Sequence, residues 1–214
     1  MTENEPTPRE MLALVADQQR SVAGQMGAFV PVILFAWAIA WFGGFGALWL
    51  SATGALAIEA AAIVFIVLLV GAGAASVVAG IRSGRGVRTG KDAAFVGTVY
   101  GQAWWIGTLA IFGIGRALVA NGMAEGLLAV FYPSGYVFFA GLMYVLGATL
   151  WRAVPMLVLG LWAILVSVVA PFIGAPTHFL VFALAGGAGF LVGAVWTQLW
   201  SRSARRRLGS SDGA

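Results

Sequence analysis

Six long runs of apolar residues, each about as long as a membrane-spanning helix, limit what this chain can fold into. A helix needs about 20 apolar residues to cross the hydrocarbon core of a bilayer. The runs cover 28–50, 56–81, 93–119, 127–150, 154–172 and 179–200. Their residues do not alternate between apolar and polar, as those of a membrane barrel strand would. The sequence therefore predicts six membrane-spanning helices with short connections.

The composition indicates that lipid surrounds the fold. The 214 residues are 61% hydrophobic and 9% charged, whereas a soluble domain carries about 25% charged residues. Inside a bilayer every backbone amide must find its partner within the chain, which favours helices. We predict an all-α membrane protein with a six-helix bundle over 28–200. A cytoplasmic segment, 1–27, precedes the bundle, and a basic, disordered tail, 201–214, follows it.

The positive charges divide unequally between the two sides of such a bundle. Lysine and arginine collect in the cytoplasmic segments of membrane proteins. If the N-terminus is inside, eleven of the twelve lie on the inner side and Arg116 alone lies on the outer side. An even number of spans is needed to produce this division, so the sequence predicts that both termini are cytoplasmic.

Two inner segments carry further signals. Residues 7–10, TPRE, form a capping box with Pro8 at the first helical position. They predict a short amphipathic helix over 8–23 on the inner membrane face, with a bend at Gly24 and Gly27. The loop 82–91, RSGRGVRTGK, is not a phosphate-binding P-loop, because the position of its first glycine holds Arg85. It is interpreted as a basic turn at the anionic inner leaflet.

Four polar side chains are the candidate substrate-binding residues. Glu59, Arg116 and His178 fall near the outer ends of helices, and Gln102 lies deep in the third span. A carboxylate and a guanidinium at similar depth can pair, and histidine titrates near neutral pH. One hypothesis is an outer vestibule that binds a polar or charged ligand. The simpler interpretation is interface charges that reach the headgroups, together with one helix–helix hydrogen bond from Gln102.

Small residues at helical spacing predict close helix packing. Gly97 and Gly101 are four residues apart, and so are Gly189 and Gly193. This spacing lets helix backbones touch, which favours association where lipid supplies no hydrophobic force. Packing within one bundle is the preferred interpretation over a dedicated dimer motif.

Metal and redox chemistry have few side chains to use. The chain has no cysteine and a single histidine, so thiolate zinc sites, iron–sulfur clusters and paired-histidine sites are excluded within one chain. We predict no cofactor and no resident metal.

A protease is the least favoured function. Ser134 in the stretch PSG, followed late in the chain by His178, resembles the nucleophile and base of rhomboid intramembrane serine proteases. However, the first glycine of the family's G-x-S-G motif is missing. Apolar residues, 179–181, also follow the histidine where that family has glycines.

A second resemblance covers most of the chain. The stretch DQQRSV at 17–22, the Trp- and Gly-rich first span and the segment GAPTHFLVFALAGGAGFLVGA at 174–194 resemble small six-helix integral membrane proteins of high-GC Gram-positive bacteria. That group is loosely labelled "transporter". The resemblance implies a location in the bacterial plasma membrane and no particular substrate.

The sequence thus predicts a non-enzymatic protein, either a small transporter or a membrane subunit of a transport system. We expect a cavity between helices that opens at the outer face, since kinked or broken helices support such sites; the candidate kinks are Pro31, Pro133 and Pro171. The alternative is a sensor or scaffold that recruits a cytoplasmic partner. Expected partners are the lipid bilayer, an ATP-binding or other cytoplasmic subunit and a second copy of the chain, but no nucleic acid.

Overall fold

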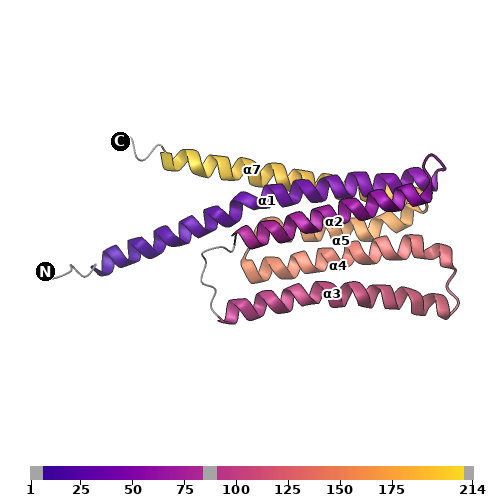
Figure 1. Cartoon of the computed structure of the whole chain (residues 1–214), viewed down its shortest axis with the longest axis horizontal. Coiled ribbons are helices and arrows are strands. Elements are labelled where there is room, and N and C mark those ends of the chain that lie inside the picture. Colours follow the sequence, from indigo (N-terminus) through magenta and orange to yellow (C-terminus); the bar gives the residue numbers. More distant parts are fainter. Residues whose placement is uncertain (1–6, 84–90, 210–214) are drawn as a thin grey trace.

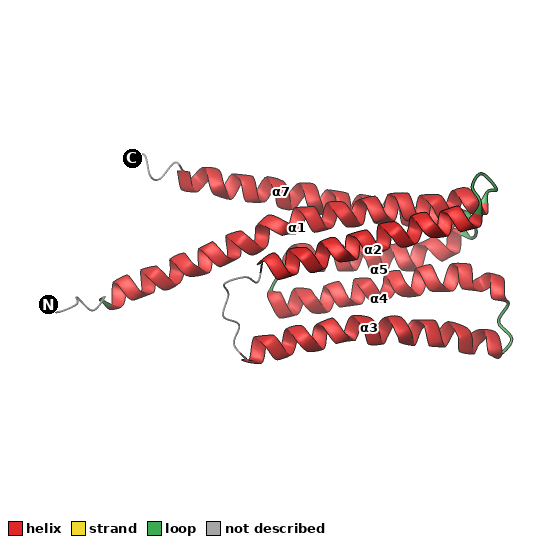
Figure 2. Cartoon of the chain, in the orientation of Figure 1, coloured by secondary structure: helices red, strands yellow, loops and turns green. Residues whose placement is uncertain are grey.

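The computed structural model describes residues 7–83 and 91–209, and these form an all-α bundle (Figure 2). No strand occurs within those two stretches. Six helical segments are long and apolar enough to cross a membrane, which confirms the predicted number. Each predicted limit of a span lies within two residues of the observed one. The chain has the architecture of a multi-pass membrane protein.

Five spans are single helices and the sixth is composite. The single helices are α1 (Pro8–Ala52), α2 (Ile58–Ser83), α3 (Lys91–Ala120), α4 (Leu128–Trp151) and α5 (Val154–Ile173). A 3-10 turn, η1 (Glu125–Leu127), precedes α4. The sixth span runs through α6 (Thr177–Val181), a π-helix, η2 (Phe182–Gly186), and α7 (Gly187–Gly209).

At the N-terminal end, residues 8–23 are helical as predicted, but the predicted bend at Gly24 and Gly27 is wrong, because α1 continues through both glycines into the first span. Glycine permits a bend but keeps its backbone N–H, so it does not interrupt the ladder of hydrogen bonds. The tail predicted to be disordered from residue 201 is helical as far as Gly209. Of the predicted basic turn at 82–91, residues 84–90 lie outside the described residues, while Arg82 and Ser83 belong to α2 and Lys91 begins α3.

The helices form two groups. The most extensive contacts join α1 to α2 and α7 in one group, and α4 to α5 in the other. Helix α3 lies at one edge of the bundle and packs chiefly on α4 (Figure 1). Helix α1 begins, and α7 ends, at the same end of the bundle (Figure 1). We call this the terminal end.

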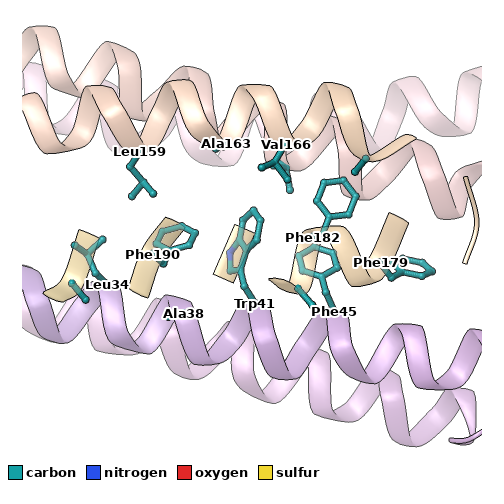
Figure 3. Close-up of a cluster of buried hydrophobic side chains, with 14 residues drawn as sticks. Leu34, Ala38, Trp41, Phe45, Leu159, Ala163, Val166, Phe179, Phe182 and Phe190 are labelled. Atoms are coloured by element: carbon teal, nitrogen blue, oxygen red, sulfur yellow. The ribbon is translucent and has the colours of Figure 1, made fainter. Parts of the chain in front are cut away.

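A cluster of aromatic and aliphatic side chains joins the two groups. Phe182 is completely buried, and its ring centroid lies 5.2 Å from that of Phe45. Trp41 lies at the same distance, 5.2 Å, from Phe190. In Figure 3 these rings of α1, η2 and α7 face the aliphatic side chains of α5. Aromatic pairs contribute about 0.5–1.5 kcal/mol each beyond the area that they bury.

Glycines mark where helix backbones touch, although not all the predicted ones do. A Cβ atom on Gly160 would lie 2.7 Å from the carbonyl oxygen of Gly141, and one on Gly141 would lie 2.8 Å from that of Gly160. The backbones of α4 and α5 therefore cross in direct contact. The predicted packing within the bundle at Gly97 and Gly101 is wrong, because nothing lies within 4 Å of a Cβ atom on either residue.

The Gly141–Gly160 crossing supplies the first testable prediction. We expect Gly160→Ala to lower stability by about 1–3 kcal/mol, because the new methyl group forces two backbones apart. The matched control is Gly73→Ala on α2, where the added Cβ meets open space; it should leave stability unchanged or raise it. Thermal unfolding of the purified proteins in detergent measures both. Equal losses in the two variants would contradict the crossing.

Candidate functional site

His178 lies at a place where the helix ladder of α4 is interrupted. Pro133 has no N–H group and cannot donate to the carbonyl four residues earlier, which belongs to Ala129. The ring nitrogen Nε2 of His178 lies 2.9 Å from that carbonyl oxygen. A carbonyl oxygen can only accept, so Nε2 carries the proton and donates it. His178 thus satisfies the backbone group that Pro133 leaves without a partner.

This hydrogen bond gives His178 a structural role. The residue is fully buried, and its ring centroid lies 4.0 Å from that of Phe179 and 6.2 Å from that of Phe182. With the proton on Nε2 the other nitrogen, Nδ1, is an acceptor. Nδ1 is buried and has no hydrogen-bond partner. The side chain is therefore held inside the bundle, whereas the vestibule hypothesis needs it to face water.

The other three predicted residues do not converge with His178. Glu59 is exposed in the first turn of α2, and Arg116 is exposed near the end of α3. No ion pair joins them, because α2 packs mainly on α1 and α3 mainly on α4. Gln102 is exposed on α3, and its amide makes no hydrogen bond with any described residue. Glu59, Arg116, Gln102 and His178 line neither of two cavities that the described part of the bundle contains.

Ser134 and His178 do not form a catalytic pair. The hydroxyl oxygen of Ser134 is buried and has no hydrogen-bond partner. The histidine nitrogen that donates is bonded to the Ala129 carbonyl, and the other has no partner. A serine nucleophile needs a base within hydrogen-bond reach. Ser134 instead lines a shallow, mostly apolar depression of about 360 Å³ between α4 and α5, together with Ser167.

A larger cavity lies in the terminal half of the bundle. It has a volume of about 470 Å³, within the roughly 300–1,000 Å³ typical of ligand pockets. Four helices enclose it: the first part of the span in α1, the first part of α5, the first half of α7 and, through Tyr144, α4. The lining residues are Val30, Ile33, Leu34, Tyr144, Pro155, Met156, Val158, Leu159, Trp162, Ala188, Gly189, Val192, Gly193 and Trp196.

The cavity opens toward the surrounding membrane. Val158 of α5 and Val192 of α7 both line it and are respectively 50% and 65% exposed. Leu34 and Leu159, which belong to the core cluster, form its buried wall (Figure 3). Since α5 and α7 belong to different groups of helices, the gap between them is a lateral opening at the depth of the acyl chains.

The polar atoms around this cavity are few. The indole nitrogen of Trp162 donates to the carbonyl oxygen of Ala185 at 2.8 Å. Ala185 belongs to the π-helix η2. Such turns often occur at functional sites. Tyr144 lines the cavity, and its hydroxyl makes no hydrogen bond with any described residue. The site can therefore enclose an apolar molecule and offer its head one hydroxyl group.

Comparison with protein-family models, with curated proteins and with solved structures yields no match for this chain. The site is therefore interpreted from its own geometry. Among the described residues, no group of three His, Asp or Glu side chains lies together as metal ligands would.

The sequence predicted a cavity that opens at the outer face, whereas the larger cavity lies toward the terminal end of the bundle. Its position was missed because the prediction relied on polar residues and prolines. The walls of the cavity are residues that any membrane helix contains, and only the arrangement of α1, α4, α5 and α7 brings them together. The sequence held one signal for this region: Gly189 and Gly193, small residues at helical spacing, both line the cavity. The structure places the indole ring of Trp162 where a Cβ atom of Gly189 would lie.

The pairing of His178 with Pro133 gives a second prediction. His178→Phe keeps a ring among the neighbouring phenylalanines but removes the donor, so we expect a loss of about 1–3 kcal/mol of stability. In the Pro133→Ala variant, the backbone N–H of residue 133 is restored and can donate to the carbonyl of Ala129. In that background His178→Phe should therefore cost about 1 kcal/mol less stability. Thermal unfolding of the four proteins of this cycle is the measurement. An equal loss in both backgrounds would rule out the coupling.

Proposed function

We propose that the protein is a small transporter, or the membrane subunit of a transport system, for a lipophilic molecule. The observation that carries this proposal is the cavity of about 470 Å³ with apolar walls, open to the membrane between α5 and α7. The proposed location is the plasma membrane of a bacterium, with the terminal end in the cytoplasm. An ATP-binding subunit at that end would supply energy if the transport is active.

The chemistry of the walls favours this class of substrate over a polar one. A polar solute would leave its water shell without gaining hydrogen bonds, at a cost of about 2–7 kcal/mol for each amide or hydroxyl group. An acyl chain or another elongated apolar molecule loses nothing by leaving the bilayer for such a cavity. Tyr144 can hydrogen-bond a carboxyl or hydroxyl head, which would fix the orientation of the molecule.

The division of the helices into two groups supports movement of such a substrate. The cavity lies between α5 of one group and α1 with α7 of the other. Transporters commonly work by one group of helices rocking against another around a central site. A small rotation of the α4–α5 pair would widen or close the lateral opening while the tight contacts inside each group stay intact.

Filling the cavity tests this proposal. We expect Val158→Trp to lower the affinity for a fluorescent fatty acid by roughly tenfold or more, because the indole ring occupies the space of the acyl chain. Binding is measured with the protein in nanodiscs, and transfer between leaflets with reconstituted vesicles. Tyr144→Phe should weaken binding of the fatty acid but not of a fluorescent hydrocarbon, which has no head group.

The matched control is Val169→Trp. Val169 is exposed on the same helix, at 44%, and does not line the cavity. This variant should bind and transfer the fatty acid as the unaltered protein does. If the unaltered protein binds no lipophile, or if both tryptophan variants behave alike, the cavity is not the substrate site.

A second candidate function rests on the helices that extend beyond the spans. Helix α1 begins at Pro8, 21 residues before its span starts at Phe29, which corresponds to about 31 Å of helix. Helix α7 continues ten residues past Leu199 to Gly209 at the same end. Two helices projecting from one membrane face suit a scaffold that recruits a cytoplasmic partner.

Deleting residues 1–23 separates the two candidates. A scaffold would lose its partner, whereas a transporter that acts alone should keep its full rate of lipophile transfer. We expect the transfer rate to be unchanged within a factor of about two, because the cavity begins at Val30. The transfer assay on reconstituted vesicles measures this, and size-exclusion chromatography checks that the shortened protein folds.

A further inference from the structure

Gln102 exposes a carboxamide to lipid in the interior of the membrane. It follows Asp92, where the third span begins, by ten residues, which corresponds to about 15 Å along α3. The span ends 18 residues beyond it, at Ala120. The span of 29 residues is about 43 Å long, so when it is centred on a hydrocarbon core of about 30 Å, Gln102 lies about 8 Å inside the boundary of the core. Its short side chain cannot reach the headgroups on either side.

The amide of Gln102 makes no hydrogen bond with any described residue, whereas two other polar side chains of α3 do. Thr108 donates to the carbonyl of Trp104 in its own helix, and Tyr100 donates to the carbonyl of Met143 on α4. An amide in hydrocarbon can form two to four hydrogen bonds and forms none here. Polar groups at that depth usually face another helix, so the face of α3 that carries Gln102 needs a covering partner.

That face has the spacing of a helix–helix interface. Thr98, Gln102, Trp105 and Leu109 are separated by four, three and four residues, which is the heptad pattern of a packed seam. Trp105 is 71% exposed and Leu109 is 67% exposed. Helix α3 is also the least enclosed span, since only 6% of its central stretch is buried, against 39% for the first span. We call these four residues the α3 seam.

We propose that the α3 seam is the contact between two copies of this chain, with Gln102 of one copy hydrogen-bonded to Gln102 of the other. A carboxamide is self-complementary, because it carries both a donor and an acceptor. Two copies inserted in the same direction place this residue at the same depth, so a twofold axis along the membrane normal brings the amides together. Each NH₂ group then donates to the other copy's carbonyl oxygen.

Two features of α3 are compatible with this contact. Gly97 and Gly101 are open, so no side chain of either residue keeps a second helix away. Helices packed by a heptad seam cross at about 20° and diverge away from the contact. Arg116, two turns beyond Leu109, is exposed near the end of the span. Its long side chain can reach the headgroups, so the dimer does not bury two positive charges together.

Energy transfer between labelled full-length copies in lipid vesicles tests the proposal. The unaltered protein should associate as its density in the membrane rises. Gln102→Leu should weaken association roughly tenfold, as expected for the loss of two hydrogen bonds in a membrane. The matched control is Thr108→Val, which also replaces an exposed polar residue of α3 by an apolar one, about a quarter of a turn away from the middle of the seam. It should associate normally.

Cross-linking locates the contact independently, because the chain has no cysteine of its own. Leu109→Cys should form a disulfide between copies, whereas Thr108→Cys and Ala110→Cys, at nearly the same depth but on other faces, should not. The proposal is overturned if the protein stays monomeric at high density. It is also overturned if Gln102→Leu associates as strongly as the unaltered protein, or if the three cysteine variants cross-link equally. A different membrane protein found on the seam of a monomeric chain would overturn self-association as well.

Discussion

Hydrocarbon around this chain offers no hydrogen bonds, so every backbone group must be satisfied by the protein itself. Where the helix ladder is interrupted, a side chain takes over. Pro133 leaves the carbonyl of Ala129 without its usual donor, and the imidazole of His178 replaces that donor. Aromatic side chains also donate to backbone carbonyls: the indole N–H of Trp162 donates to Ala185, and the hydroxyl of Tyr100 donates to Met143. These bonds also tie together helices that are distant in sequence.

The same solvent removes the hydrophobic force that would press soluble helices together, so packing must supply the attraction. Here flat aromatic rings lie on glycines. Trp41 of α1 covers Gly186, Phe42 covers Gly187, and Trp162 of α5 covers Gly189. These glycines are close together in the sequence. The end of the π-helix and the start of α7 are therefore packed between rings of α1 and a ring of α5. The two largest side chains that are fully buried, His178 and Phe182, lie just before these glycines in the sequence.

The architecture could be predicted because length and hydropathy decide it. All six spans were located to within two residues, since the thickness of the bilayer sets their length. The spacing of Gly97 and Gly101 misled the prediction, because small residues permit close packing without specifying the partner. His178 was recognised as unusual, but its role depends on a proline 45 residues earlier in the chain. Its partner is a backbone carbonyl, and sequence patterns carry no signal for such a group. The apolar cavity could not be predicted either, because its residues differ from other membrane residues only in where they meet.

The position of the cavity follows from these contacts. Helix α7 is held against α1 by the aromatic rings on Gly186 and Gly187, and α5 is held against α4 by the direct crossing at Gly141 and Gly160. Toward the terminal end, α5 meets α7 where the indole ring of Trp162 lies on Gly189, and the cavity lies beside that contact. A molecule entering from the membrane occupies space that no side chain fills, so it leaves the crossing at Gly141 and Gly160 and the rings on Gly186 and Gly187 undisturbed. Binding a lipophile there therefore costs the fold little.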